Sequence, residues 1–121
     1  MREFDGAFGF HDCDRPKVPA PGRPQFVEVE ASWINDRPRA GRRPIGSLLF
    51  DERGRPALTD MDQFDRAVGA GFLPQDSRLS GFFARFMASL DSLDAVATCR
   101  EYPVQVPYYP LVLSVTEPAP V

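Results

Sequence analysis

The sequence is poor in the residues on which catalysis and metal binding most often depend. Among 121 residues it has one histidine, His11, and two cysteines, Cys13 and Cys99. A structural zinc site takes four such ligands, and a hydrolase triad needs an imidazole beside its nucleophile. Because the sequence has neither a CxxC pair nor a GxSxG motif, we predict no metal ion, no cofactor and no serine-based active site.

Long apolar runs and a secretory signal are also missing. No stretch approaches the ~20 apolar residues of a membrane-spanning helix, and the longest uncharged run, residues 102–116, contains three prolines. The first ten residues carry acids where a secretory signal carries bases, and they include no apolar segment. We therefore expect a protein that does not bind membranes, lies in the cytoplasm and keeps its cysteines as thiols.

Lysine is nearly absent, because Lys17 is the only basic residue that is not an arginine. The net charge is only −3, but the charges are unevenly distributed. Residues 15–56 carry nine bases and five acids, whereas residues 57–121 carry four bases and eight acids. Such a chain can present two faces of opposite potential to a partner, or can pair the opposite charges within itself.

Proline, in contrast, is abundant, with 13 residues, and its positions divide the chain. Residues 15–25 form a proline-rich segment that we expect to be extended, since proline fixes φ and gives no N–H to a ladder. Residues 34–44 are typical of a polar, arginine-rich loop, and residues 117–121 of a proline-containing tail. Because the length suits one core, we predict a single domain over residues 1–121.

Alternating apolar and polar residues predict strands near the two ends of this domain. Residues 25–33 have an apolar residue at every second position, the pattern of a half-buried antiparallel strand: Val27, Val29, Ala31 and Trp33. Residues 45–50 predict a second strand, which ends in a tight turn at Gly54. Residues 111–115 predict a last strand, and residues 102–106 an edge strand because of their proline. Phe8 and Phe10 can add one more.

Apolar residues at helical spacing predict two helices between the strands. The first covers residues 60–69, with Thr59 as its cap. The second covers residues 77–93, with Asp76 or Ser77 as its cap, and its apolar positions recur every three or four residues. We therefore predict an α+β domain in which an antiparallel sheet of about four to five strands carries the two helices on one face.

Two exposed segments are the best candidates for partner binding. The loop over residues 34–44 holds four arginines, Arg37, Arg39, Arg42 and Arg43. Tyr108 and Tyr109 lie among prolines in a second, stiff segment, and tyrosine contributes large contact areas to interfaces. These six residues predict a surface that docks onto a protein, and the arginines can alternatively contact the phosphates of a nucleic acid.

The leading hypothesis is a non-catalytic protein-binding module, an inhibitor or accessory protein of the kind found in phages and mobile elements. Two alternatives stay open. The chain can be a small enzyme that uses Cys99 or a cluster of three carboxylates, Asp60, Asp62 and Asp65, or it can be a nucleic-acid accessory protein. The aspartates are equally what the first turn of a helix favours, and Cys99 can be a small buried apolar residue.

Overall fold

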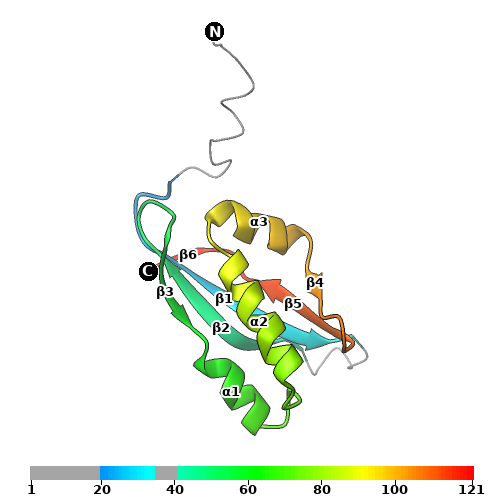
Figure 1. Cartoon of the computed structure of the whole chain (residues 1–121). Coiled ribbons are helices and arrows are strands. Elements are labelled where there is room, and N and C mark those ends of the chain that lie inside the picture. Colours follow the sequence, from blue (N-terminus) through cyan, green and yellow to red (C-terminus); the bar gives the residue numbers. More distant parts are fainter. Residues whose placement is uncertain (1–19, 35–40) are drawn as a thin grey trace.

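A six-stranded antiparallel sheet carries three helices on one face (Figure 1). The computed structural model describes residues 20–34 and 41–121. The strands are β1 (Gln25–Trp33), β2 (Arg43–Phe50), β3 (Pro56–Asp60), β4 (Val104–Gln105), β5 (Leu111–Val115) and β6 (Ala119–Pro120). The helices are α1 (Asp62–Gly69), α2 (Ser77–Ser89) and α3 (Leu93–Glu101). The predicted α+β architecture is confirmed, with one helix more than expected.

Some of the predictions made from the sequence lie outside the described residues. They concern the strand at Phe8 and Phe10, the histidine and first cysteine at His11 and Cys13, and the loop arginines Arg37 and Arg39. The first part of the proline-rich segment over residues 15–25 also lies outside, because the description begins at Ala20.

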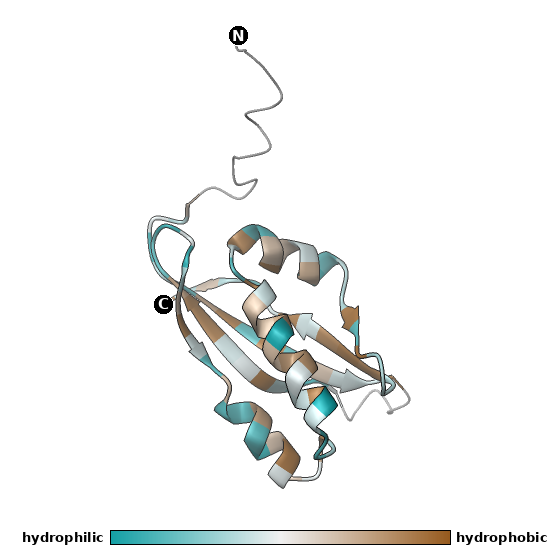
Figure 2. Ribbon diagram, in the orientation of Figure 1, coloured by the Kyte–Doolittle hydropathy of each residue, from teal (hydrophilic) through white to brown (hydrophobic). Residues whose placement is uncertain are grey.

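The strand order is β3-β2-β1-β5-β4, which puts β1 in the middle of the sheet. Val27, Val29 and Ala31 of β1 are fully buried, whereas Glu28 and Glu30 on the opposite face are half-buried. Figure 2 shows hydrophobic residues in brown alternating with paler ones along β1 and β2. Successive side chains of a strand point to opposite faces, so the alternation turns one face of β1 to the core and the other away from it.

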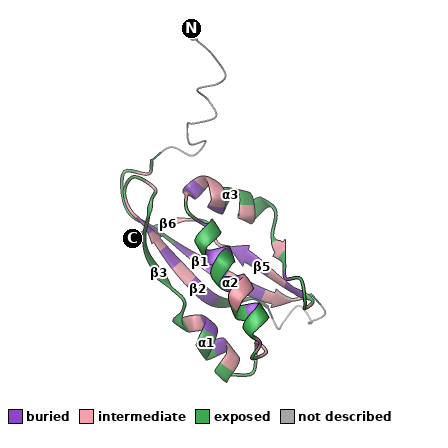
Figure 3. Ribbon diagram, viewed as in Figure 1, coloured by how far each residue is buried: buried purple, intermediate pink, exposed green. Residues whose placement is uncertain are grey.

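The helices cover the inner face of the sheet, where purple marks buried residues in Figure 3. Helix α2 contributes the largest share, with Leu79, Phe83, Phe86 and Met87 buried. Phe64 of α1 stacks on Phe83, with 4.7 Å between the ring centroids. Gly46 of β2 lets the side chains of Phe83 and Met87 lie close to the sheet, since a Cβ atom there would lie 2.9 Å from Cζ of Phe83 and 3.0 Å from Cε of Met87.

The C-terminal residues return to the sheet and pair with β1 beside β5. Phe26 pairs with Ala119 of β6, and Val29 pairs with Val115 of β5. Between them the backbone N–H of Thr116 donates to the carbonyl of Glu28 at 2.9 Å, and the N–H of Glu28 donates to Oγ1 of Thr116 at 2.8 Å. Residues 117–121 are therefore bound at the sheet.

Strand β3 corrects the predicted start of the first helix. Thr59 and Asp60, expected at a helix start, are the last residues of β3 and pair with Leu48 and Ser47 of β2. Helix α1 begins two residues later, and Oδ1 of Asp60 accepts the backbone N–H of Asp62 at 2.9 Å. Pairing with the neighbouring strand outweighed the local helix signal here, because it satisfies the backbone groups of several residues together.

The second predicted helix, over residues 77–93, is in fact two. Asp76 is its N-cap as expected, but α2 ends at Ser89. Leu93 begins α3, whose cap is Ser92, with Oγ accepting the N–H of Ala95 at 3.1 Å. A serine that caps a new helix interrupts the old one, although the apolar spacing continues across the break. No helix among the described residues is long and apolar enough to cross a membrane.

Candidate functional site

Five separate segments meet at the end of the sheet where β1 stops and β2 begins. They are the two strand ends, the link between α1 and α2, the start of α2, and the loop between β4 and β5. Their side chains form a continuous set of contacts that we call the arginine–aromatic cluster: Trp33, Arg43, Phe72, Asp76, Arg78, Tyr108 and Tyr109.

Trp33 is the centre of the cluster. Its indole Nε1 donates a hydrogen bond of 2.9 Å to the carbonyl oxygen of Phe72, which fixes the link between the helices against β1. Its ring meets Phe72 and Tyr109 edge-on, at centroid distances of 6.5 and 6.1 Å. Edge-to-face pairs of this kind add to the free energy gained from burial, so three distant segments are held together at one indole.

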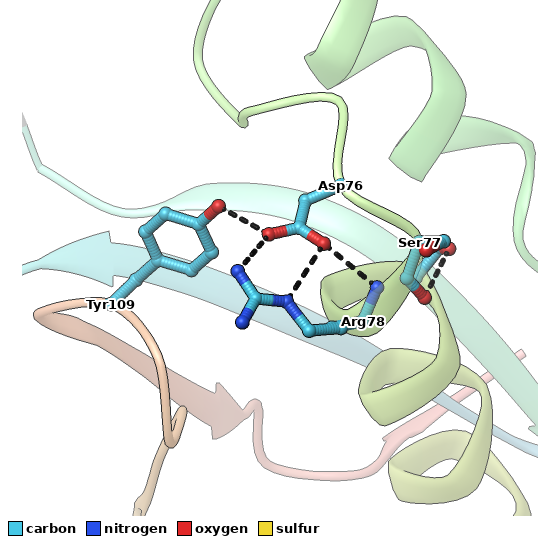
Figure 4. A network of polar contacts seen from close by, with 5 residues as sticks. Asp76, Ser77, Arg78 and Tyr109 are labelled. Carbon is cyan, nitrogen blue, oxygen red and sulfur yellow. Dashed lines mark hydrogen bonds and ion pairs between the residues drawn. The ribbon is translucent and has the colours of Figure 1, made fainter.

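Asp76 joins the start of α2 to the β4–β5 loop (Figure 4). Its Oδ1 accepts the backbone N–H of Arg78 at 2.8 Å, as a helix cap does. Its Oδ2 accepts the hydroxyl of Tyr109 at 2.6 Å and Nη2 of Arg78 at 3.0 Å, while Nε of Arg78 donates to Oδ1 at 3.3 Å. The Asp76 side chain is 15% exposed and is thus enclosed by its donors.

These donors shift the protonation of both acids in the network. The hydrogen bond from the guanidinium of Arg78 and then that from Tyr109 hold the pKa of Asp76 well below its ordinary value. Donating to a charged carboxylate in turn raises the pKa of Tyr109, because the phenolate would face that carboxylate. At neutral pH Asp76 is therefore an anion and Tyr109 a neutral donor, and neither is poised to exchange a proton.

Two guanidinium groups lie over aromatic rings at the surface of the cluster. Cζ of Arg43 is 4.7 Å from the ring centroid of Phe72, and Cζ of Arg78 is 4.4 Å from that of Tyr108. A guanidinium over a ring is attracted by the negative face of the ring and still has N–H groups on its edge. Arg43 makes no ion pair with any other residue that the structure describes.

Beside the cluster, Arg43 borders a hollow of about 310 Å³ between β2 and α1. Arg66 of α1 lines the same hollow, together with Gln63 and Ala67. Two cations that flank one small hollow favour a negatively charged group in it, since both attract it. The hollow has the volume to accept a side chain.

The structure thus brings together three of the six residues predicted for partner binding. Arg43 and Tyr108 lie at the surface of the arginine–aromatic cluster, and Tyr109 lies within it. Arg42 is exposed next to Arg43. Arg37 and Arg39 lie outside the described residues.

The residues that connect these predicted ones carry few signals in the sequence. The spacing predicts Trp33 only as one of the apolar residues on one side of its strand, and Asp76 is predicted only as a helix cap. Phe72 and Arg78 belong to no periodic pattern or motif. The one signal in the sequence was the tryptophan at the strand end, since a buried indole N–H needs an acceptor from elsewhere in the chain.

The residues of the enzyme hypothesis lie elsewhere and do not assemble. Cys99 is a half-buried free thiol on α3, and burial raises its pKa, which disfavours the reactive thiolate. Asp60 ends β3, whereas Asp62 and Asp65 belong to the exposed first turn of α1. Within residues 20–34 and 41–121 no group of three or more His, Cys, Asp or Glu side chains is arranged to hold a metal ion.

A search of protein-family models, curated proteins and solved structures found no match to this chain.

Proposed function

We propose that this chain is a non-catalytic protein-binding module, which docks onto an acidic segment of a partner through the arginine–aromatic cluster. The observation that carries the proposal is the convergence of exposed Arg43, Arg78 and Tyr108 on a rigid aromatic base. Arginine and tyrosine are the residue types that contribute most to binding hot spots. Because the base is already packed, little side-chain freedom is lost when a partner binds.

The chemistry of the partner follows from the two exposed cations that line the hollow. An acidic side chain placed in the hollow between Arg43 and Arg66 would receive charge-assisted hydrogen bonds from both sides. An acidic side chain is thus the group that this surface fits best.

A protein is a better partner for this surface than a nucleic acid. The whole chain is acidic, with a net charge of −3, so its overall charge opposes a long polyanion more than a partner with one short acidic segment. An inhibitory or accessory role in the cytoplasm, such as phages and mobile elements use, is part of the proposal. A module of this kind acts by covering a surface of its partner, and it needs no catalytic group of its own.

The test is a pull-down with the tagged chain from lysate of the source organism or its host, run with and without nuclease. We expect a stoichiometric protein partner that survives nuclease. Replacing Arg43→Glu together with Arg66→Glu should weaken its binding by roughly tenfold or more, since hydrogen bonds to charged groups contribute about 1.5–3 kcal/mol each.

The matched control is the double variant Arg23→Glu with Arg85→Glu, which makes the same change of charge at two exposed positions away from the cluster. It should capture the partner as well as the unmodified chain does. Equal loss in both double variants would mean that only net charge matters, and loss of all captured material on nuclease treatment would make nucleic acid the ligand. Either result contradicts the proposal.

A further inference from the structure

The edge strand β3 is a second surface that is open to a partner, on a different side of the molecule from the arginine–aromatic cluster. It pairs with β2 on one side, and no described strand pairs with its other side. All five of its residues are exposed, and it is green along its length in Figure 3. An edge strand presents unpaired N–H and C=O groups, which are a template for one more strand.

An apolar row on the outer face of the sheet, away from the helices, leads to this edge. Ala119, Phe26, Leu49 and Leu58 are successive cross-strand partners in β6, β1, β2 and β3. Phe26 is 40% exposed and Leu58 is 64% exposed. Together with Leu49 and Val121 they line a hollow of about 460 Å³. The row ends at Leu58, so its apolar surface meets solvent at the edge of the sheet.

The charges around β3 are opposite at its two ends. Arg55 directly precedes the strand, whereas Asp60 ends it and Asp62 follows. If β3 pairs antiparallel with β3 of a second copy about an axis at Leu58, Pro56 lies opposite Asp60 of the other copy. The basic end of each strand then lies beside the acidic end of the other, and two-fold symmetry makes this contact twice.

We propose that the chain forms a two-fold symmetric dimer by antiparallel pairing of β3 with β3 of a second copy. The pairing joins the two sheets into one continuous sheet. Leu58 of each copy meets Leu58 of the other at the axis, so that the two apolar rows become one. This proposal does not depend on the proposed partner-binding function, because it uses other residues.

The composition of the strand selects this pairing over others. Proline and charged residues at an edge disfavour pairing with an arbitrary strand, and Pro56 and Asp60 occupy the two ends of β3. Antiparallel self-pairing places the end with Arg55 beside the end with Asp60 of the other copy, whereas parallel self-pairing would place like charges side by side. Because the contact is confined to a five-residue strand and its outer row, we expect it to bury less than the ≈800 Å² per partner of a standard interface. The dimer should therefore be weak and depend on concentration.

Sedimentation velocity of the full chain over a wide concentration range tests the proposal. We expect the apparent mass to rise from that of one chain toward twice that value. Leu58→Glu places two carboxylates at the axis and should raise the dimer dissociation constant at least tenfold. The control Tyr102→Glu changes another exposed large residue, 66% exposed at the end of α3, and should leave the dimer intact.

A charge exchange separates the pairing from general damage to the fold. Arg55→Asp alone and Asp60→Arg alone should each weaken the dimer, because both place like charges side by side. The double variant should regain most of the lost affinity, since its strand ends are again complementary. A chain that stays monomeric, a dimer that Leu58→Glu does not affect, or a double variant no better than the single ones would overturn the proposal.

Discussion

At the scale of single residues, Asp76 shows how much one side chain can connect. It caps α2 through the N–H of Arg78, accepts the Arg78 guanidinium, and receives the hydroxyl of Tyr109 from a loop 33 residues away along the chain. All of these donors favour the charged carboxylate, which is why its pKa is lowered. The capping role is visible in the sequence, and the contact with Tyr109 is not.

The lowered pKa of Asp76 predicts a specific pH dependence of stability. Its ordinary pKa is 3.8, so the stabilisation by the charged form is complete above about pH 5 and is lost as the pH falls through the lower pKa of the folded state. Asp76→Asn keeps an oxygen for the cap but has no charge. We expect urea unfolding to show the variant less stable at about pH 7 and the two proteins closer together at about pH 2. A constant difference would contradict this account.

Gly46 predicts an effect of adding a single methyl group. Gly46→Ala would place Cβ against Phe83 and Met87 in a closely packed core and should destabilise the fold by about 1–3 kcal/mol. The control is Gly69→Ala, because a Cβ atom at that exposed position of α1 would meet no atom within 4 Å apart from its neighbours along the chain and the backbone of its own helix. The control should change stability by less than about 1 kcal/mol, in the stabilising direction. Chemical denaturation of both variants measures their changes in the free energy of unfolding, and equal changes would refute the packing argument.

At the scale of secondary-structure elements, α2 follows its sequence most closely. Its large apolar residues recur at helical spacing, and those on one stripe are buried against the sheet. The end of the helix was harder to predict, because Leu93 fits the same spacing but belongs to α3. Spacing indicates which face is buried, whereas the position of a helix end depends on a single cap.

Replacing Phe86 tests how much the buried face of α2 stabilises the fold. Its side chain is 6% exposed, so Phe86→Ala should cost about 3–5 kcal/mol through lost burial and the cavity left behind. Urea unfolding, with Ala88→Ser on the exposed side of the same helix as control, measures the difference. A loss below about 1 kcal/mol would mean that this face of α2 meets solvent or a partner instead.

Strand β3 is the element for which local signals were misleading. Thr59 with Asp62 three residues later resembles the start of a helix, and a helix does begin close by. The preceding turn was the better signal. Gly54 has φ of +82°, and Oδ1 of Asp51 accepts the N–H groups of Arg53 and Arg55 at 2.9 Å. A strand that ends in such a turn is commonly followed by its antiparallel partner.

At the scale of the whole molecule, the central position of β1 determines which strands of the sheet can open locally and which open only on global unfolding. β1 pairs with β2 on one side and with β5 and β6 on the other, whereas β3 and the two-residue β4 lie at the edges. A central strand opens only when its neighbours separate, so its hydrogen bonds break with global unfolding, while edge strands open locally.

Native-state hydrogen exchange should reveal this order. We expect the amides over residues 27–31 to open with a free energy equal to that of global unfolding, as measured with denaturant. The amides of β3 and β4 should exchange through openings of lower free energy. The opening free energy of the β3 amides should rise when the protein concentration favours the proposed dimer. Exchange of β1 through a smaller opening than global unfolding would contradict the central role of this strand.

The sequence by itself determined the local features: the inner and outer faces of β1, the apolar stripe of α2, the Asp76 cap and the glycine turn. These depend on residues a few positions apart, where strand and helix periods and backbone geometry act directly. Only the tertiary structure decided that Arg43, Phe72 and Tyr109 meet around Trp33, and that β3 lies at an edge. Such contacts depend on strand order and on the path of three helices across the sheet, which residue spacing along the chain does not encode.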